Sequence, residues 1–247
     1  RYSFTRVRLK NNQPVPNMIH ISCGSGHSVL VDSENAVWSF GNNCYFQLGR
    51  STRNDISKTP KKLDQPIAIA KTSCGDFHSV LLSRCGTELL LCGTLKPSHN
   101  NRIVVSSIFL LSQSDHSLSY HPVDFTACQP LLPVVKLIEK DHSICIRKLY
   151  SGKNYLLALD TQGVLYVFGD NSRNQLGVPG STSINRLVIH PHPFNYPISV
   201  SVSKTSTVVV DKHNDVLIFG DNSLGQLGIS AVQSIPVPMR LDDWIIA

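Results

Sequence analysis

The residues that could do chemistry in this 247-residue chain are spaced in ways that suit few catalytic or metal sites. His190 and His192, each followed by a proline, resemble half of a metal site, but no third ligand has a suitable spacing. The seven cysteines are odd in number and include no Cys-x-x-Cys pair. Phosphate-loop, nucleophile-elbow and His-Glu-x-x-His motifs are absent from the sequence. We therefore expect no bond-making chemistry, no metal and no cofactor.

Charge and composition favour a protein that acts by binding. The net charge of +6 suits an acidic partner such as DNA, anionic lipid or an acidic protein face, or simply a mildly basic surface. No stretch approaches the roughly 18 apolar residues that a membrane helix needs. The odd number of cysteines and the absence of an Asn-x-Ser/Thr sequon favour a cytoplasmic or nuclear setting.

Four segments of the chain repeat one pattern. An aligned strand-end glycine occurs at Gly41, Gly93, Gly169 and Gly220, so the spacings are 52, 76 and 51 residues. Three of the four repeats contain a Phe-Gly-[Asn/Asp]-Asn turn followed by Gln-Leu-Gly. A match of this length at this period indicates repeated supersecondary units.

Each repeat contains short apolar runs separated by polar turns. Residues 28–31, 79–82, 155–159 and 207–210 have the length and the Val and Leu content of buried strands. A second run follows each turn as the hairpin partner, and its closing glycine can take a positive φ or admit a neighbouring backbone. We expect the leucines of the Gln-Leu-Gly segments to fill the space between neighbouring sheets; they are Leu48, Leu176 and Leu227.

One such sheet cannot bury both of its faces, so the sheets must pack against one another. Radial repetition solves this problem and leaves only short edges. Leucine-rich, ankyrin and TPR repeats are shorter and contain helices, and the double glycine of kelch blades is absent. The prediction is an all-β protein: a single β-propeller domain over 1–247 with four or five four-stranded blades.

Two segments fall outside the regular pattern. The 76-residue spacing places about 25 extra residues near 97–130, which we interpret as a hairpin-like insertion in one blade or as a degenerate blade. Residues 236–246 are expected to form the first strand of a further unit, which could close the ring against the N-terminal segment.

The string from Cys-Gly-x-x-His-Ser through Phe-Gly-Asn-Asn to Gln-Leu-Gly resembles the regulator-of-chromosome-condensation repeat family. The resemblance covers most of residues 1–93 and 133–247. Members of that family are typically seven-bladed propellers, and the family is known for guanine-nucleotide exchange on the small GTPase Ran. Such exchange needs no catalytic acid or base, because the factor binds the nucleotide-free GTPase better than the loaded one.

The resemblance also implies a set of partner-binding residues. In the Gly-x-x-His loops, His27, Asp76 and His78 occupy positions that face Ran in the founding member. The third repeat departs from the pattern with Lys153 and Asn154, and the fourth with Lys204. The alternative role for both histidines is structural, in which each would hydrogen-bond a turn carbonyl and order its blade.

The resulting functional expectation is an exchange factor or binder for a Ran-like small GTPase, acting by protein–protein contact. Some family members are bacterial effectors, which would place this chain in the host cytosol. A scaffolding propeller without exchange activity is the alternative. Association with DNA or chromatin is a third, motivated by the net charge.

Overall fold

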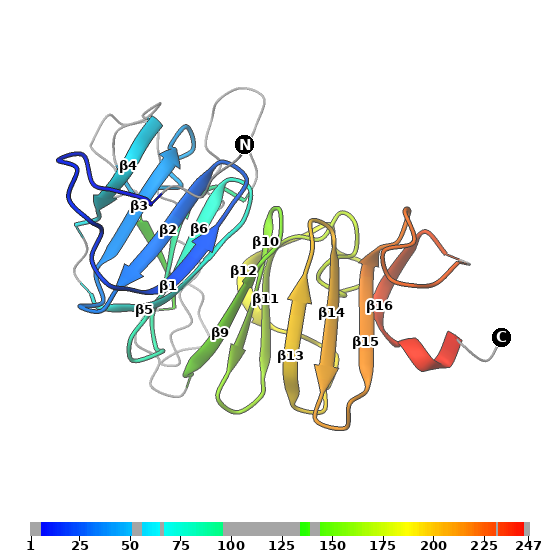
Figure 1. The fold of residues 1–247 in the computed structure, drawn as a ribbon. Helices are drawn as coiled ribbons and strands as arrows, with labels where there is room; N and C mark the ends of the chain where they lie inside the picture. The colour runs from blue at the N-terminus through cyan, green and yellow to red at the C-terminus, as the bar shows by residue number, and fades with distance from the viewer. Residues whose placement is uncertain are drawn as a thin grey trace.

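The computed structural model describes residues 6–50, 56–64, 67–95, 134–138, 144–230 and 232–244. These residues form four antiparallel sheets of four strands each, set one after another in an arc (Figure 1). The predicted all-β propeller of four-stranded blades is confirmed. The strands are β1 (Met18–Cys23), β2 (His27–Asp32), β3 (Val37–Asn42), β4 (Ile56–Lys62), β5 (Ile69–Cys74), β6 (His78–Ser83), β7 (Leu89–Gly93), β8 (Val134–Ile138), β9 (Ile146–Ser151), β10 (Tyr155–Asp160), β11 (Leu165–Asp170), β12 (Ser183–Ile189), β13 (Pro197–Val202), β14 (Ser206–Asp211), β15 (Val216–Asp221) and β16 (Ser234–Arg240).

Each blade is a meander built from one continuous run of chain. The first blade has the order β1-β2-β3-β4, and the second, third and fourth blades repeat this order with β5–β8, β9–β12 and β13–β16. The first strands of neighbouring blades, β1, β5, β9 and β13, lie against one another along the arc. The loop that follows each of these strands is therefore brought close to its counterparts in the other blades.

The strand-end glycines have the conformation expected of them. Gly41 has a φ of 105°, and a Cβ atom there would lie 2.5 Å from the main-chain oxygen of Gly26. The pairing register shifts next to this glycine, between Ser39 and Gly41. A side chain at this position would therefore be strained and would also collide with the neighbouring strand.

The Asn of the Phe-Gly-[Asn/Asp]-Asn turn explains why it recurs together with Gln-Leu-Gly. Asn43 Oδ1 accepts a hydrogen bond of 2.9 Å from the main-chain N–H of Leu48. Asn171 accepts the equivalent bond from Leu176 at 2.8 Å, and Asn222 accepts it from Leu227 at 2.9 Å. All three leucines are buried, as predicted. The amide thus fixes the loop that carries each leucine inward.

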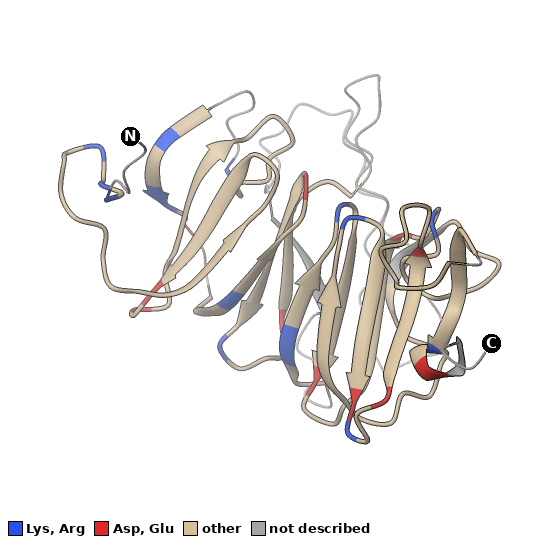
Figure 2. Ribbon diagram, turned by 45° about the vertical axis from the view of Figure 1, so that its right-hand side comes forward, with Lys and Arg blue, Asp and Glu red and all other residues tan. Residues whose placement is uncertain are grey.

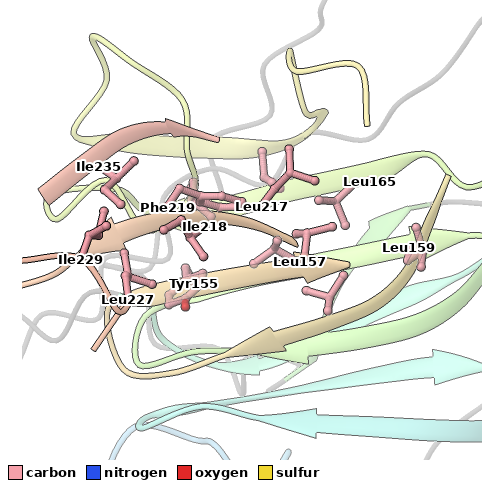
Figure 3. Close-up of a cluster of buried hydrophobic side chains, with 14 residues drawn as sticks. Tyr155, Leu157, Leu159, Leu165, Leu217, Ile218, Phe219, Leu227, Ile229 and Ile235 are labelled. Atoms are coloured by element: carbon pink, nitrogen blue, oxygen red, sulfur yellow. The ribbon is translucent and has the colours of Figure 1, made fainter. Parts of the chain in front are cut away.

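The apolar core lies in layers between successive blades. Between the third and fourth blades, Tyr155, Leu157 and Leu159 pack against Leu217 and Phe219 (Figure 3). These side chains occupy alternate positions along β10 and β15, so each central strand turns its two faces to two different neighbours. Burial of both faces follows from the stacking of blades, as the sequence pattern predicts.

A polar contact, here termed the interblade latch, joins the first blade to the second. Ser79 Oγ donates to the main-chain oxygen of Gln47 at 2.8 Å and shares a second bond of 2.8 Å with His27 Nε2. Because the hydroxyl proton is used on Gln47, His27 Nε2 must be the donor in the second bond. The latch therefore links a hydroxyl of one blade to the Gln-Leu-Gly loop of the preceding blade.

The third and fourth blades share the same latch. Thr207 Oγ1 donates to the main-chain oxygen of Gln175 at 2.8 Å. Tyr155 occupies the position of His27; its hydroxyl donates to the main-chain oxygen of Ser206 at 2.8 Å and lies 3.3 Å from Thr207 Oγ1. The side chains differ, but the hydroxyl-to-carbonyl contact is conserved between the two junctions.

Among the described residues, no such latch joins the second blade to the third. Leu156 occupies the hydroxyl position, and the second repeat lacks the Gln-Leu-Gly segment. His78 is fully buried there, and among the described residues neither of its ring nitrogens has a hydrogen-bond partner. Apolar packing holds this junction instead, in a cluster that includes Leu156, Tyr166 and Phe168.

The expectation for the C-terminal segment was wrong. Residues 234–240 form β16, which pairs with β15 as the fourth strand of the last blade, and a 3-10 helix, η1 (Leu241–Trp244), follows. The alternating Pro236 and Pro238 are tolerated because β16 is an edge strand.

The insertion predicted at about 97–130 lies outside the described residues. No helix in the described part of the chain is long and apolar enough to span a membrane.

Candidate partner-binding face

The loops after β1, β5, β9 and β13 surround a cavity of about 330 Å³ at one end of the innermost strands. The polypeptide turns back at a glycine in three of these loops, at Gly24, Gly75 and Gly152. A Cβ atom at Gly75 would lie 2.4 Å from the main-chain oxygen of Gly152, so the loops approach each other closely. The cavity is lined by Cys23, Gly24, Ser25, Cys74, Gly75, Asp76, Ser151, Gly152, Lys153, Val202, Ser203 and Lys204.

Three of the predicted partner-binding residues meet in this cavity: Asp76, Lys153 and Lys204. Main-chain hydrogen bonds join each of their loops to the next. Asp76 N–H donates to Lys153 O at 3.0 Å, and Lys153 N–H donates to Lys204 O at 3.4 Å. None of the three side chains forms an ion pair with another described residue. The cavity therefore presents two ammonium groups and one carboxylate that are available to a partner.

His27 and His78 lie beneath this surface. Their exposed fractions are 4% and 0%, so direct contact between either ring and a partner would require the loops to open. Burial lowers the pKa of His27 to about 4 and, together with the nearby His27, lowers the pKa of His78 to about 3. Both rings are therefore neutral at physiological pH.

Asn154 lies beside the cavity and does not line it. The side chain is half-buried, and its Oδ1 has no hydrogen-bond partner among the described residues. The main-chain oxygen of Asn154 accepts a bond of 2.9 Å from Asp170 N–H, which ties the loop to β11. The residue is thus fixed through its backbone.

The sequence analysis missed the serines of the same face. Ser25, Ser151 and Ser203 line the cavity together with the charged residues. Their position in the repeat could have identified them, because each serine is next to the loop glycine or stands in place of it. The neighbouring Cys74 is unreactive, because burial raises the pKa of its thiol to about 11.

The His-Pro-His-Pro segment is a structural element. His190 Nε2 lies 2.8 Å from the main-chain oxygen of Leu176, and its Nδ1 accepts a bond of 3.0 Å from His192 N–H. The ring also packs against Phe194 and Phe219. Both nitrogens of His190 are therefore occupied. In the described ranges, no three His, Cys, Asp or Glu side chains gather as metal ligands would.

Basic residues are spread over the molecule. Figure 2 shows Lys and Arg on the sheets at both ends of the arc and on those between them. The cavity holds only two of the 23 Lys and Arg residues of the chain, Lys153 and Lys204. Its charge can therefore recognise a local acidic group, whereas a long polyanion would need contacts over several sheets.

Comparison with known proteins agrees with this geometry. The model of the "Regulator of chromosome condensation (RCC1) repeat" matches residues 34–82, and a second model of the same repeat matches residues 18–47. The human X-linked retinitis pigmentosa GTPase regulator is 28% identical over 71% of this chain and 15% of its own length. Mouse serine/threonine-protein kinase Nek9 is 28% identical over 86% of this chain and 21% of its own length. The chain thus spans only a minor part of these relatives.

Solved structures show the same fold. Prp20p from Saccharomyces cerevisiae, described with its binding properties to Gsp1p and histones, superposes with a TM-score of 0.69 at 20% identity. The match covers 96% of this chain and 56% of Prp20p. Human WBSCR16 superposes with a TM-score of 0.67, also at 20% identity, over 94% of this chain and 53% of its own.

The four contiguous blades and the loop face on their inner strands define a protein of the β-propeller class. Within that class, residues 18–82 match models of the regulator of chromosome condensation (RCC1) repeat. The described chain also has the fold of the solved RCC1-type propeller Prp20p.

Proposed function

We propose that this chain binds a Ran-like small GTPase through the cavity face and accelerates the release of its nucleotide. The observation that carries the proposal is the meeting of Asp76, Lys153 and Lys204 in one cavity with no ion-pair partner among the described residues. A charged cavity of this kind suits a partner whose surface offers the complementary charges. A relative named as a GTPase regulator and the Prp20p structure described with Gsp1p support a GTPase as that partner.

Exchange by this chain would require no bond-making residue. If the face binds the nucleotide-free GTPase more tightly than the loaded form, linkage weakens nucleotide binding by the same factor. His27 contributes by fixing its loop through Ser79, and neither of the neutral, buried histidines takes part in proton transfer.

The test measures release of a fluorescent GDP analogue from Ran and from Rab, Rho and Arf GTPases, together with direct binding to each. The informative variant is the double charge reversal Lys153→Glu with Lys204→Glu. We expect it to weaken binding by about tenfold or more, equivalent to about 1.4 kcal/mol. Lys212→Glu is the matched control, because Lys212 is an exposed lysine in the turn at the other end of β14.

The outcomes separate the candidate functions. Accelerated release that the double variant loses and the control keeps would support exchange at this face. Binding without acceleration would reduce the proposal to a GTPase-binding scaffold. Absence of binding to every GTPase would overturn it. A salt-sensitive affinity for DNA or histones would instead favour chromatin association, for which the net charge of +6 and the description of Prp20p with histones are the motivation.

A further inference from the structure

An exposed cysteine, Cys85, lies in the turn between β6 and β7 of the second blade. Its Sγ lies 3.2 Å from Ser83 Oγ and 3.0 Å from Thr87 Oγ1. Ser83 Oγ accepts a bond of 3.0 Å from Glu88 N–H and can still donate its own proton to Cys85. Hydrogen bonds from Ser83 and then from Thr87 lower the pKa of the Cys85 thiol. Since the thiolate is the nucleophilic form, this turn favours a reactive cysteine.

A second cysteine, from the third blade, rests against this turn. Cys145 directly precedes β9, and its Sγ lies 3.6 Å from the main-chain oxygen of Cys85. Ile146 N–H donates to Gly86 O at 2.8 Å, so the two segments lie side by side. A Cβ atom on Gly86 would lie only 2.9 Å from Cys145 Sγ. Thr161 N–H donates to Cys145 O at 2.8 Å, which holds Cys145 to the third blade.

The spacing of these two segments suits a disulfide between Cys85 and Cys145. Backbones joined by a main-chain hydrogen bond lie about 5 Å apart, and a disulfide spans Cα atoms about 4.4–6.8 Å apart. Cys85 is exposed, so its Sγ can turn about the Cα–Cβ bond without displacing packed side chains. The buried Cys74 and Cys92 are poor competitors, because burial raises the pKa of their thiols to about 11 and about 12.

We infer that Cys85 and Cys145 form a reversible disulfide when the protein meets a hydroperoxide, and that this bond links the second blade to the third. These two blades meet at the junction where, among the described residues, no interblade latch forms. The disulfide would add a covalent contact to a junction that otherwise relies on apolar packing. The inference does not depend on the proposed GTPase partner, because neither cysteine lines the cavity.

The oxidation proceeds in two steps. The Cys85 thiolate attacks one oxygen of the hydroperoxide, the O–O bond breaks, and the leaving alkoxide or hydroxide takes up a proton; the product is a sulfenic acid on Cys85. Cys145 Sγ then attacks Cys85 Sγ, the S–O bond breaks, and the leaving hydroxide combines with the thiol proton of Cys145 as water. The two thiols lose two electrons, which the hydroperoxide gains. A thiol reductant reverses the link by disulfide exchange.

The experiment treats the reduced 247-residue chain with hydrogen peroxide, blocks the remaining thiols with N-ethylmaleimide and maps the disulfides by mass spectrometry. The expected product is a monomer that yields a linked pair of peptides containing Cys85 and Cys145. Cys85→Ser and Cys145→Ser should each abolish the link, and in Cys145→Ser dimedone should trap the sulfenic acid on Cys85. Cys23→Ser is the matched control, because Cys23 is also exposed and its loss should leave the link unchanged.

Urea denaturation tests what the link does to the junction. The two cysteines are 60 residues apart in the chain, so the link restricts the unfolded chain and should raise the urea midpoint of the oxidised protein. Cys85→Ser should have the same midpoint with and without peroxide, and dithiothreitol should restore the reduced midpoint of the wild type. A wild-type chain in which Cys85 stays unlinked, or pairs with a different cysteine or another copy, would overturn the inference. A link that leaves the midpoint unchanged would overturn its role at the junction.

Discussion

The junction between the second and third blades differs from the two junctions that flank it. At the flanking junctions, Ser79 and Thr207 donate to a main-chain carbonyl of the preceding blade. At the middle junction Leu156 replaces the hydroxyl residue, and His78 is buried without a partner among the described residues. A junction between two blades can therefore be held either by a polar latch or by apolar packing. The residue at the repeat position of Ser79, Leu156 and Thr207 decides which of the two forms.

The largest expected effect comes from removing the packing that replaces the latch. Leu156→Ala should lower the free energy of unfolding by about 3 kcal/mol, since a fully buried leucine is replaced by a cavity. Urea denaturation measures this loss. Leu224→Ala is the control, because Leu224 is 90% exposed and its truncation should change stability by less than about 0.5 kcal/mol. Equal effects of the two substitutions would show that packing does not hold the middle junction.

A smaller loss is expected where the latch exists. Ser79→Ala removes the hydroxyl that bonds Gln47 and His27 and leaves both groups buried. The expected loss is about 1–3 kcal/mol by the same denaturation assay. Ser201→Ala, at an exposed serine on β13, should be almost neutral. If Ser79→Ala were as mild as Ser201→Ala, the latch would be a consequence of blade packing and not a cause of it.

The smallest effect at neutral pH is expected at the two histidines, and it should differ in sign between them. His78→Leu removes an unpartnered buried ring and should raise the free energy of unfolding by about 1 kcal/mol at pH 7.5. His27→Leu removes a bonded ring and should lower it by a similar amount. If the free energy of unfolding fell in both variants, the two junctions would not differ in the way proposed.

Acidification should increase the difference in free energy of unfolding between His78→Leu and the wild type. Its pKa is lowered to about 3 in the folded chain, mainly by burial, so below pH 6.5 the unfolded chain binds a proton that the folded chain does not. Stability must then fall as the pH drops from about 6.5 toward 3, by up to about 1.4 kcal/mol per pH unit for this group. The advantage of His78→Leu over the wild type should grow over the same range. An advantage that stays constant with pH would mean that His78 titrates normally in the folded chain.

The repeat pattern predicts much of the fold because its information is local. The strand-end glycines, the polar turns and the inward leucines each depend on residues of their own repeat, and the structure confirms them at Gly41, Asn43 and Leu48. The last strand was misassigned because a Pro-containing run after Gln-Leu-Gly carries no signal for whether it ends one blade or begins another. Pairing of β16 with β15 settles that question.

The environment of the two loop histidines could not be read from the loops themselves. His27 and His78 occupy the same motif position, and the ring of His27 bonds Ser79 of the following repeat. The residue equivalent to Ser79 in the repeat that follows His78 is Leu156. Comparison of that second position across the repeats, Ser28, Ser79, Leu156 and Thr207, would have separated the two histidines. The charged residues were easier to place, because Asp76, Lys153 and Lys204 occupy equivalent loops that the stacking of blades brings together.

The contiguity of each blade has a consequence for synthesis on the ribosome. All strand pairs of the first sheet lie within residues 18–62, so this sheet can assemble once those residues have left the exit tunnel. Among the described strands, each pairs only with its neighbours in the sequence, so none of these sheets depends on a strand from a distant part of the described chain. Such short-range pairing keeps the entropy cost of loop closure low. Each nascent blade then offers the next one a finished surface on which to form.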